Sequence, residues 1–202
     1  MARPTRFRTD RQLALVADNL LVRFASEYGW SRAMPIPVEQ IVERLYGIAI
    51  EWHELEEPAG ASILGALDPV ARTIALNTRH EQLFSEVLGP YEFTLGHELG
   101  HWLFDADDPN QLNLLDAPSD RFCHSRNSGN LSKEQQWRET NANRFAAELL
   151  MPSDLIAQVD EVDLVGRMNE YAREWGVSRT ALRIRLETLG VIDDHPDEQS
   201  LW

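Results

Sequence analysis

The chain has 202 residues and 43% of them are hydrophobic, so it can bury the core of one domain, or of one domain with a small appendage. Its formal net charge of −14 repels nucleic acid phosphates at long range, which argues against nucleic acid as the main partner and favours basic partners. Its single cysteine, Cys123, cannot form an intramolecular disulfide, which is consistent with a reducing compartment.

No targeting or membrane-spanning segment is predicted. The arginines among residues 1–11 imitate the basic start of a secretory signal, but Asp18, Asn19 and Arg23 interrupt the apolar residues that follow. No later run approaches the roughly 20 apolar residues of a membrane span. We therefore expect a soluble, cytoplasmic protein that has no membrane partner.

The first part of the chain predicts two helices followed by a small sheet. Apolar residues recur at intervals of three and four over residues 10–28 and again over residues 38–46, where Gly47 ends the second helix. Three short β-prone runs follow, at residues 48–52, 62–67 and 72–76. The turn chemistry of residues 67–71 joins the last two runs as a hairpin, so we expect a small antiparallel sheet.

The rest of the chain predicts helices separated by one long polar segment. Helices are predicted over residues 80–88, 91–104 and 133–151. Gly89-Pro90 breaks the first from the second, and Pro152 ends the third. Residues 105–132 are polar and show no clear period, and segments of this length inside a domain are usually functional or disordered.

A metal-binding motif lies in the helix predicted over residues 91–104, which contains the sequence His97-Glu98-Leu99-Gly100-His101. Two helical residues four positions apart project from one face, so both imidazoles can reach one metal ion. Glu98 is offset too far to be a ligand, yet it is close enough to bond a metal-bound water, as in H-E-x-x-H metalloproteases. The alternative is a helix with two surface histidines, which the apolar residues around the motif disfavour.

A catalytic zinc site has three protein ligands and one open position, so a third ligand is expected after the motif. The extended metzincin pattern is excluded, because Phe104 and Asp107 stand where it needs glycine and histidine. His124, which neighbours Cys123, is one candidate. The remaining candidates are acidic: Asp105, Asp107, Asp108, Asp116, Asp120, Glu134, Glu139 and Glu148.

Glu139 is the preferred third ligand because its face of the predicted helix is nearly bare of bulk. Ala142, Asn143 and Ala146 follow it at intervals of three, four and seven, so this helix can approach the histidine helix closely. Asn143 is placed one turn beyond Glu139 to bond a ligand from outside the metal shell. Two imidazole nitrogens and one carboxylate suit zinc, although such a site also accepts manganese or iron.

Two segments also resemble a known family. They are residues 93–101, FTLGHELGH, and residues 139–152, ETNANRFAAELLMP, and they resemble the ImmA/IrrE family of bacterial and phage-associated metallo-endopeptidases. The resemblance implies that His97, His101 and Glu139 are the metal ligands and that Glu98 is the catalytic glutamate. It further implies cleavage of a helix-turn-helix transcriptional repressor, which switches on genes of a mobile element or a stress response.

Residues 168–190 predict a helical hairpin that looks like a helix-turn-helix, with Ser178 as the cap of its second helix. A DNA-binding interpretation would place Arg179 and Arg183 against the groove. Residues 167–190 carry five arginines and three glutamates, and this surplus of two positive charges is a weak footprint for DNA binding. We therefore favour a hairpin that packs on the rest of the protein.

The expected fold is α+β. Residues 1–160 are predicted to form a mainly helical, zincin-like metallopeptidase domain, with the helical hairpin of residues 161–192 packed on it and a loose acidic tail at residues 193–202. A non-catalytic, metal-containing partner of the antitoxin type is the alternative function. Glu98 argues against it, because a structural zinc site closes its fourth position with a protein ligand and has no use for a base.

Overall fold

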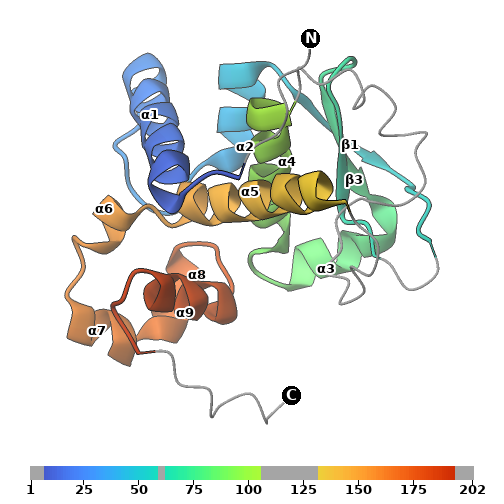
Figure 1. The fold of residues 1–202 in the computed structure, drawn as a ribbon. Coiled ribbons are helices and arrows are strands. Elements are labelled where there is room, and N and C mark those ends of the chain that lie inside the picture. The colour runs from blue at the N-terminus through green and yellow to red at the C-terminus, as the bar shows by residue number, and fades with distance from the viewer. Residues whose placement is uncertain (1–6, 59–61, 106–131, 194–202) are drawn as a thin grey trace.

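The computed structural model of the protein describes residues 7–58, 62–105 and 132–193. The helices are α1 (Asp10–Tyr28), α2 (Val38–Gln40), the π-helical turn η1 (Ile41–Leu45), the 3-10 turn η2 (Thr78–His80), α3 (Glu81–Glu86), α4 (Pro90–Asp105), α5 (Lys133–Leu150), α6 (Ser153–Ile156), α7 (Glu161–Gly166), α8 (Met168–Glu174) and α9 (Arg179–Thr188). The strands are β1 (Ala49–His53), β2 (Gly65–Asp68) and β3 (Thr73–Asn77). A mainly helical α+β fold with one small sheet was predicted, and it is confirmed (Figure 1).

Local chemistry sets the ends of α1. Thr9 and Gln12 form a capping box at its start, where each side chain bonds the backbone N–H of the other residue. Gly29 ends the helix with a φ of 70°, in the left-handed region that favours glycine. The apolar stripe of α1 is buried in the main core, as its spacing predicts.

The sheet is mixed, with strand order β1-β3-β2, and this corrects the prediction of a purely antiparallel sheet. β2 and β3 form the predicted hairpin, whose turn is held by Asp68 Oδ1, which accepts from the N–H of Val70 and of Ala71. β1 pairs with β3 in parallel. β3 takes the central position because its apolar side chains, such as Ile74 and Leu76, are fully buried.

Small residues let α4 and α5 pack closely. A Cβ atom added at Gly100 would lie 3.0 Å from Ala142 Cα and 3.2 Å from Phe145 Cδ1. One added at Gly96 would lie 3.4 Å from Ala146 Cβ, which is ordinary van der Waals contact. The close approach predicted from the small residues after Glu139 is therefore present, and it is tightest at Gly100.

We expect Gly100→Ala to lower the free energy of unfolding by about 1–3 kcal/mol, because the added methyl group overpacks a contact with backbone atoms. Gly96→Ala is the matched control on the same helix. It should be neutral or should stabilise the protein by up to about 1 kcal/mol, because alanine has the higher helix propensity. Urea denaturation of both variants tests this difference, and equal stability would show that the α4–α5 contact is not tight at Gly100.

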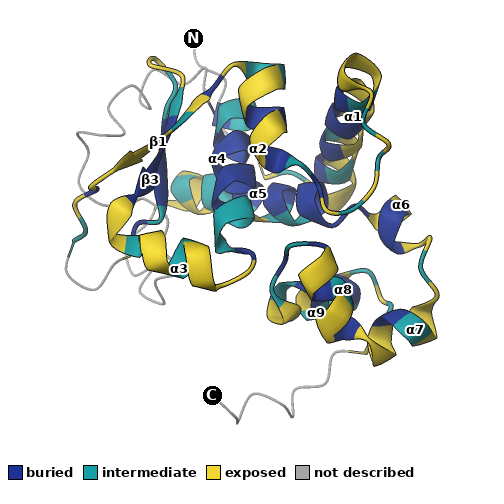
Figure 2. Cartoon of the chain, turned by 180° about the vertical axis from the view of Figure 1, so that it is seen from behind, coloured by how far each residue is buried: buried dark blue, intermediate teal, exposed yellow. Residues whose placement is uncertain are grey.

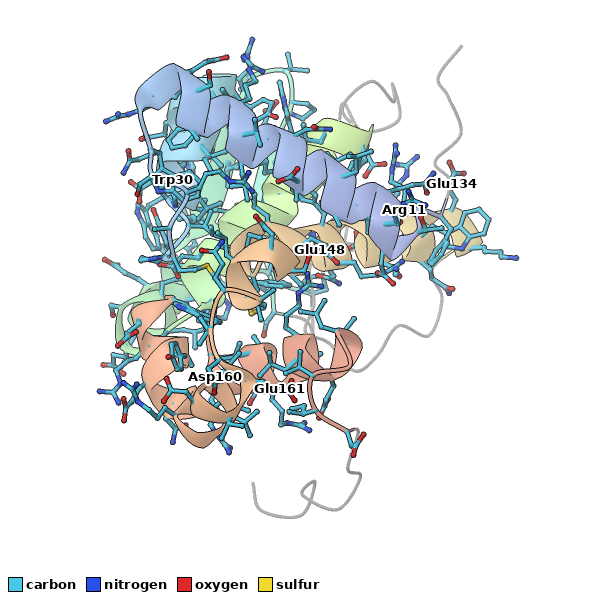
Figure 3. The ribbon with its side chains drawn as sticks, turned by 90° about the vertical axis from the view of Figure 1, so that its left-hand side faces the viewer. Arg11, Trp30, Glu134, Glu148, Asp160 and Glu161 are labelled. Atoms are coloured by element: carbon cyan, nitrogen blue, oxygen red, sulfur yellow. The ribbon has the colours of Figure 1, made fainter. Side chains whose placement is uncertain are left out.

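The C-terminal helices α7 to α9 lie below α5 in Figure 1, and their apolar residues, such as Leu164, Met168 and Leu186, belong to the main core. Arg185 of α9 makes a buried ion pair at 2.7 and 2.6 Å with Glu148 of α5, which Figure 3 labels. The turn before α4 touches the start of α9, since a Cβ at Gly89 would lie 2.8 Å from Ser178 N. Within the described ranges, no helix has the length and apolar character needed to cross a membrane.

Candidate metal centre

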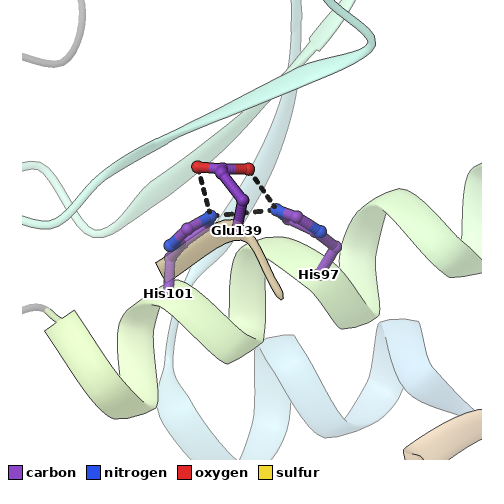
Figure 4. A group of neighbouring side chains, drawn as sticks. All are labelled: His97, His101 and Glu139. Atoms are coloured by element: carbon purple, nitrogen blue, oxygen red, sulfur yellow. Dashed lines mark hydrogen bonds and ion pairs between the residues drawn. The ribbon is translucent and has the colours of Figure 1, made fainter. Parts of the chain in front are cut away.

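Three side chains from two helices meet at one point. The α4 helix carries His97 and His101, whose Nε2 atoms lie 2.9 Å apart, and α5 carries Glu139 (Figure 4). The Glu139 carboxylate oxygens lie 3.9 Å from His97 Nε2 and 3.6 Å from His101 Nε2. One ligand atom from each residue lies within 4.8 Å of the others, so the three could hold a metal ion.

The opposite nitrogens of both imidazoles bond to oxygen acceptors. His97 Nδ1 lies 2.8 Å from Asn143 Oδ1, and His101 Nδ1 lies 3.0 Å from Asp105 Oδ2. A carboxylate accepts but does not donate, so the proton of the neutral His101 ring belongs on Nδ1, and we infer the same tautomer for His97. The two Nε2 lone pairs then point toward each other and toward Glu139, which is the donor arrangement that a cation requires.

The electrostatics of the site favour a cation as well. Burial alone would lower the pKa of His101, but the hydrogen bond to Asp105 and the negative charges of Glu139 and Glu98 outweigh burial and raise the pKa to about 9. The His97 side chain is 1% exposed and that of Glu139 is 25% exposed, so solvent reaches the site from the side of Glu139. This asymmetry suits a site that keeps one position open.

Glu98 lies between the two histidines in the sequence of α4 and is 2% exposed. Strand β2 passes beside it, since a Cβ added at Gly65 would lie 3.5 Å from Glu98 Oε1 and 2.6 Å from Thr94 Cγ2. A residue larger than glycine at position 65 would clash with Thr94, so glycine allows β2 to cross α4 at the motif. Gly65 was not predicted from the sequence to be near the site, although a glycine inside a β-prone run, here residues 62–67, signals close approach of a neighbouring group.

Several other third-ligand candidates are placed elsewhere. Asp105 bonds the far nitrogen of His101, Glu148 pairs with Arg185, and Glu134 on the surface lies 3.5 Å from Arg138. None of these three belongs to the cluster of ligand atoms. The candidates Asp107, Asp108, Asp116, Asp120 and His124 lie outside the described residues, as do nearly all of the predicted loop at 105–132 and tail at 193–202.

A contact that the sequence did not reveal fixes the start of the described chain to α5. Arg8 N donates to Asn141 Oδ1 at 3.0 Å, and Arg144 Nη1 donates to Arg8 O at 2.9 Å. The Arg8 guanidinium lies over the Phe104 ring, 4.5 Å from its centroid. The segment before α1 thus joins the C-terminal end of α4 to the helix that carries Glu139.

A helix with a His-Glu-x-x-His motif and a carboxylate from a second helix define the class of single-metal peptidases. The profile of the Peptidase M78 family, the IrrE N-terminal-like domain, matches residues 55–187. The chain belongs to this family, which confirms the resemblance noted from the sequence. No curated protein gives a match.

A solved structure of a protein named Mycobacterium tuberculosis transcriptional regulator is similar in fold, with a TM-score of 0.54 and 18% sequence identity. The similarity covers 92% of this chain but 48% of the other one, so this chain spans about half of that protein. At this identity the likeness shows the fold alone.

We expect Glu139→Ala to weaken metal binding by at least about tenfold, because two imidazoles remain from a set of three ligands. Metal analysis and competition with a chelating dye measure the loss. Glu134→Ala is the control, because Glu134 lies on the surface of the same helix and outside the cluster. If Glu139→Ala binds metal as well as the parent protein, Glu139 is not a ligand, and His124 becomes the leading candidate.

Proposed function

We propose that the chain is a zinc-dependent metallo-endopeptidase in which His97, His101 and Glu139 hold the metal and Glu98 is the general base. The observation that carries the proposal is the convergence of three ligand atoms within 4.8 Å, next to a buried glutamate of the family motif. Zinc suits two nitrogens and one carboxylate, and manganese and iron are the alternatives.

Zinc, when bound, would polarise the scissile carbonyl group and lower the pKa of its water. The chain's own residues perform the proton transfers. Glu98 accepts the proton of the attacking water and returns it to the leaving amine, and positioned general bases of this kind contribute about 10²–10⁴-fold to rate. Asn143 and Asp105 hold the imidazoles so that both Nε2 atoms face the metal position.

The proposed substrate is a basic helix-turn-helix repressor, whose cleavage would switch on genes of a mobile element or a stress response. The family membership supports a peptidase, and the net charge of −14 would attract a positively charged protein at long range. The protein of similar fold is named a transcriptional regulator, but that likeness shows the fold alone, so the role in transcription regulation is part of the proposal.

DNA binding through the C-terminal helices is the weaker alternative. Arg183 pairs with Glu187 of the same helix, and Arg185 is buried against Glu148. These contacts leave Arg179 as the exposed arginine of α9. We therefore propose that this hairpin, which packs against the core, stabilises the fold or contacts a protein partner rather than DNA. Binding to a non-specific duplex at low salt would contradict that view.

The test uses a helix-turn-helix repressor, and a gene for one next to the gene of this protein would identify the candidate. The repressor is incubated with the metal-loaded protein and with the Glu98→Gln variant, at low and at high salt, and fragments are identified by mass. We expect one discrete fragment from the parent only, in a yield that falls as salt rises. Equal cleavage at both salt concentrations would contradict the charge argument, and the absence of any fragment would favour the non-catalytic alternative.

A further inference from the structure

Strand β1 is an edge strand whose outer side pairs with no strand of the described residues, because the strand order is β1-β3-β2. Natural sheets commonly protect such edges with short strands, charged side chains, proline or a bulge, and of these β1 has its short length and one acidic side chain, Glu51. β1 has the sequence AIEWH and pairs with β3 in continuous register over all five of its residues, without a bulge. In Figure 2 it is drawn largely as exposed, beside the buried β3.

The backbone of β1 offers hydrogen-bonding groups on that outer side. The N–H of Ala49 donates to Arg72 O at 2.8 Å, so the backbone groups of Ala49 are directed at β3. Hydrogen-bonding direction alternates along a strand, so those of Glu51 also face β3, and the N–H and C=O groups of Ile50 and Trp52 face outward. An added strand could therefore form backbone hydrogen bonds with Ile50 and Trp52.

The side chains beside this edge are apolar and partly exposed. Trp52 is 43% exposed, and its ring meets Phe84 of α3 edge-on at 5.6 Å between centroids. Phe84 in turn meets Tyr91 of α4 at 6.1 Å. Val87 and Leu88, which connect α3 to α4, are also exposed, so this aromatic strip of Trp52, Phe84 and Tyr91 continues into aliphatic surface.

The surroundings of the edge and the strip are acidic. Residues 49–57 contain four glutamates and residues 81–92 contain three, and neither segment contains lysine or arginine. Arg79, between the two segments, already pairs with Glu54 at 2.7 Å. A second copy of this chain also carries a net charge of −14 and would be repelled by this acidic surface. The charge therefore favours a basic occupant over self-association.

We propose that the outer edge of β1 and the aromatic strip bind an extended basic segment of a protein partner, which adds a fourth strand to the sheet. Apolar residues of that segment would lie beside Ile50 and Trp52, on the face that these residues share with Ile74 and Leu76. Basic residues at the alternate positions would face Glu51. Main-chain pairing supplies affinity and the alternating side chains supply specificity, as in other cases of strand addition.

The test uses a nine-residue peptide of alternating lysine and valine and the full chain carrying Glu98→Gln, so that the peptide stays intact whether or not the protein is a peptidase. Amide chemical shifts are followed by NMR at low and at high salt. We expect shifts at Ile50 and Trp52, including the Trp52 indole N–H, and weaker binding at high salt. Glu51→Lys should weaken binding by about tenfold, whereas Glu174→Lys, an equal charge change on α8, should not.

A peptide N-methylated at alternate residues separates strand addition from simple charge attraction, because it keeps the lysines but cannot donate on the paired side. We expect it to lose binding. Three results would overturn the proposal: equal binding of the N-methylated peptide, shifts confined to surfaces other than β1 and α3, or shifts at β1 that depend on protein concentration alone. The last result would show that a second copy is the occupant.

Discussion

Glu98→Gln is expected to lower kcat for peptide hydrolysis by at least about a hundredfold while the metal stays bound. Glutamine has nearly the same shape as glutamate and fits the same buried position, where the side chain is 2% exposed. Its amide can still bond a water, but it cannot accept the proton that the attacking water must lose. Steady-state kinetics on a fluorogenic peptide and metal analysis of the same preparation measure the two effects.

Glu92→Gln is the matched control, because it makes the same chemical change near the start of the same helix and outside the cluster of ligand atoms. Its kcat should stay within about twofold of the parent value, as expected for a residue without a role in proton transfer. Cleavage retained by Glu98→Gln would remove Glu98 from the mechanism. Loss of metal from Glu98→Gln would instead show that the Glu98 side chain is needed for metal binding.

The candidate metal cluster could largely be predicted because the spacing of its residues follows from helix geometry. His97 and His101 share a face by their spacing, and the small residues after Glu139 indicate a face that approaches another helix. The structure brings these three residues together as expected and places Asn143 at His97. Both helices also begin and end close to their predicted limits. Pro90 is the first residue of α4, and Pro152 follows the end of α5.

Three features of the fold and the site could not be predicted from the sequence, because they depend on contacts between segments that are far apart in the chain. Strand order is one of them, since β1 and β3 are both short β-prone runs and the difference in burial decides which is central. Asp105 is another, because a residue one turn after His101 can either bind the metal or hold the imidazole. The contact of Arg8 with Asn141 joins residues 133 positions apart.

Arg185→Met is expected to lower the free energy of unfolding by about 3–5 kcal/mol, because it leaves the buried Glu148 carboxylate without its partner. Arg185 makes two bonds to Glu148 and donates through Nε to Met151 O at 3.0 Å, and its side chain is 3% exposed. Thermal unfolding should shift downward by roughly 2–4 °C for each kcal/mol lost, at this chain length. Arg23→Met is the control, because Arg23 and Glu27 form a solvent-exposed pair whose loss should change stability little.

The double variant Arg185→Met with Glu148→Met separates a missing partner from lost packing. A buried charge without its partner lowers the free energy of unfolding. Removing both charges should therefore recover much of the stability that the single change loses. If the double variant is as unstable as the sum of both single ones, the guanidinium contributes through packing and its bond to Met151 rather than through charge. Recovery of stability in the double variant would instead show that Arg185 is needed because Glu148 is charged. The role of this pair would then be to neutralise a buried charge where α9 contacts α5, the helix that carries Glu139.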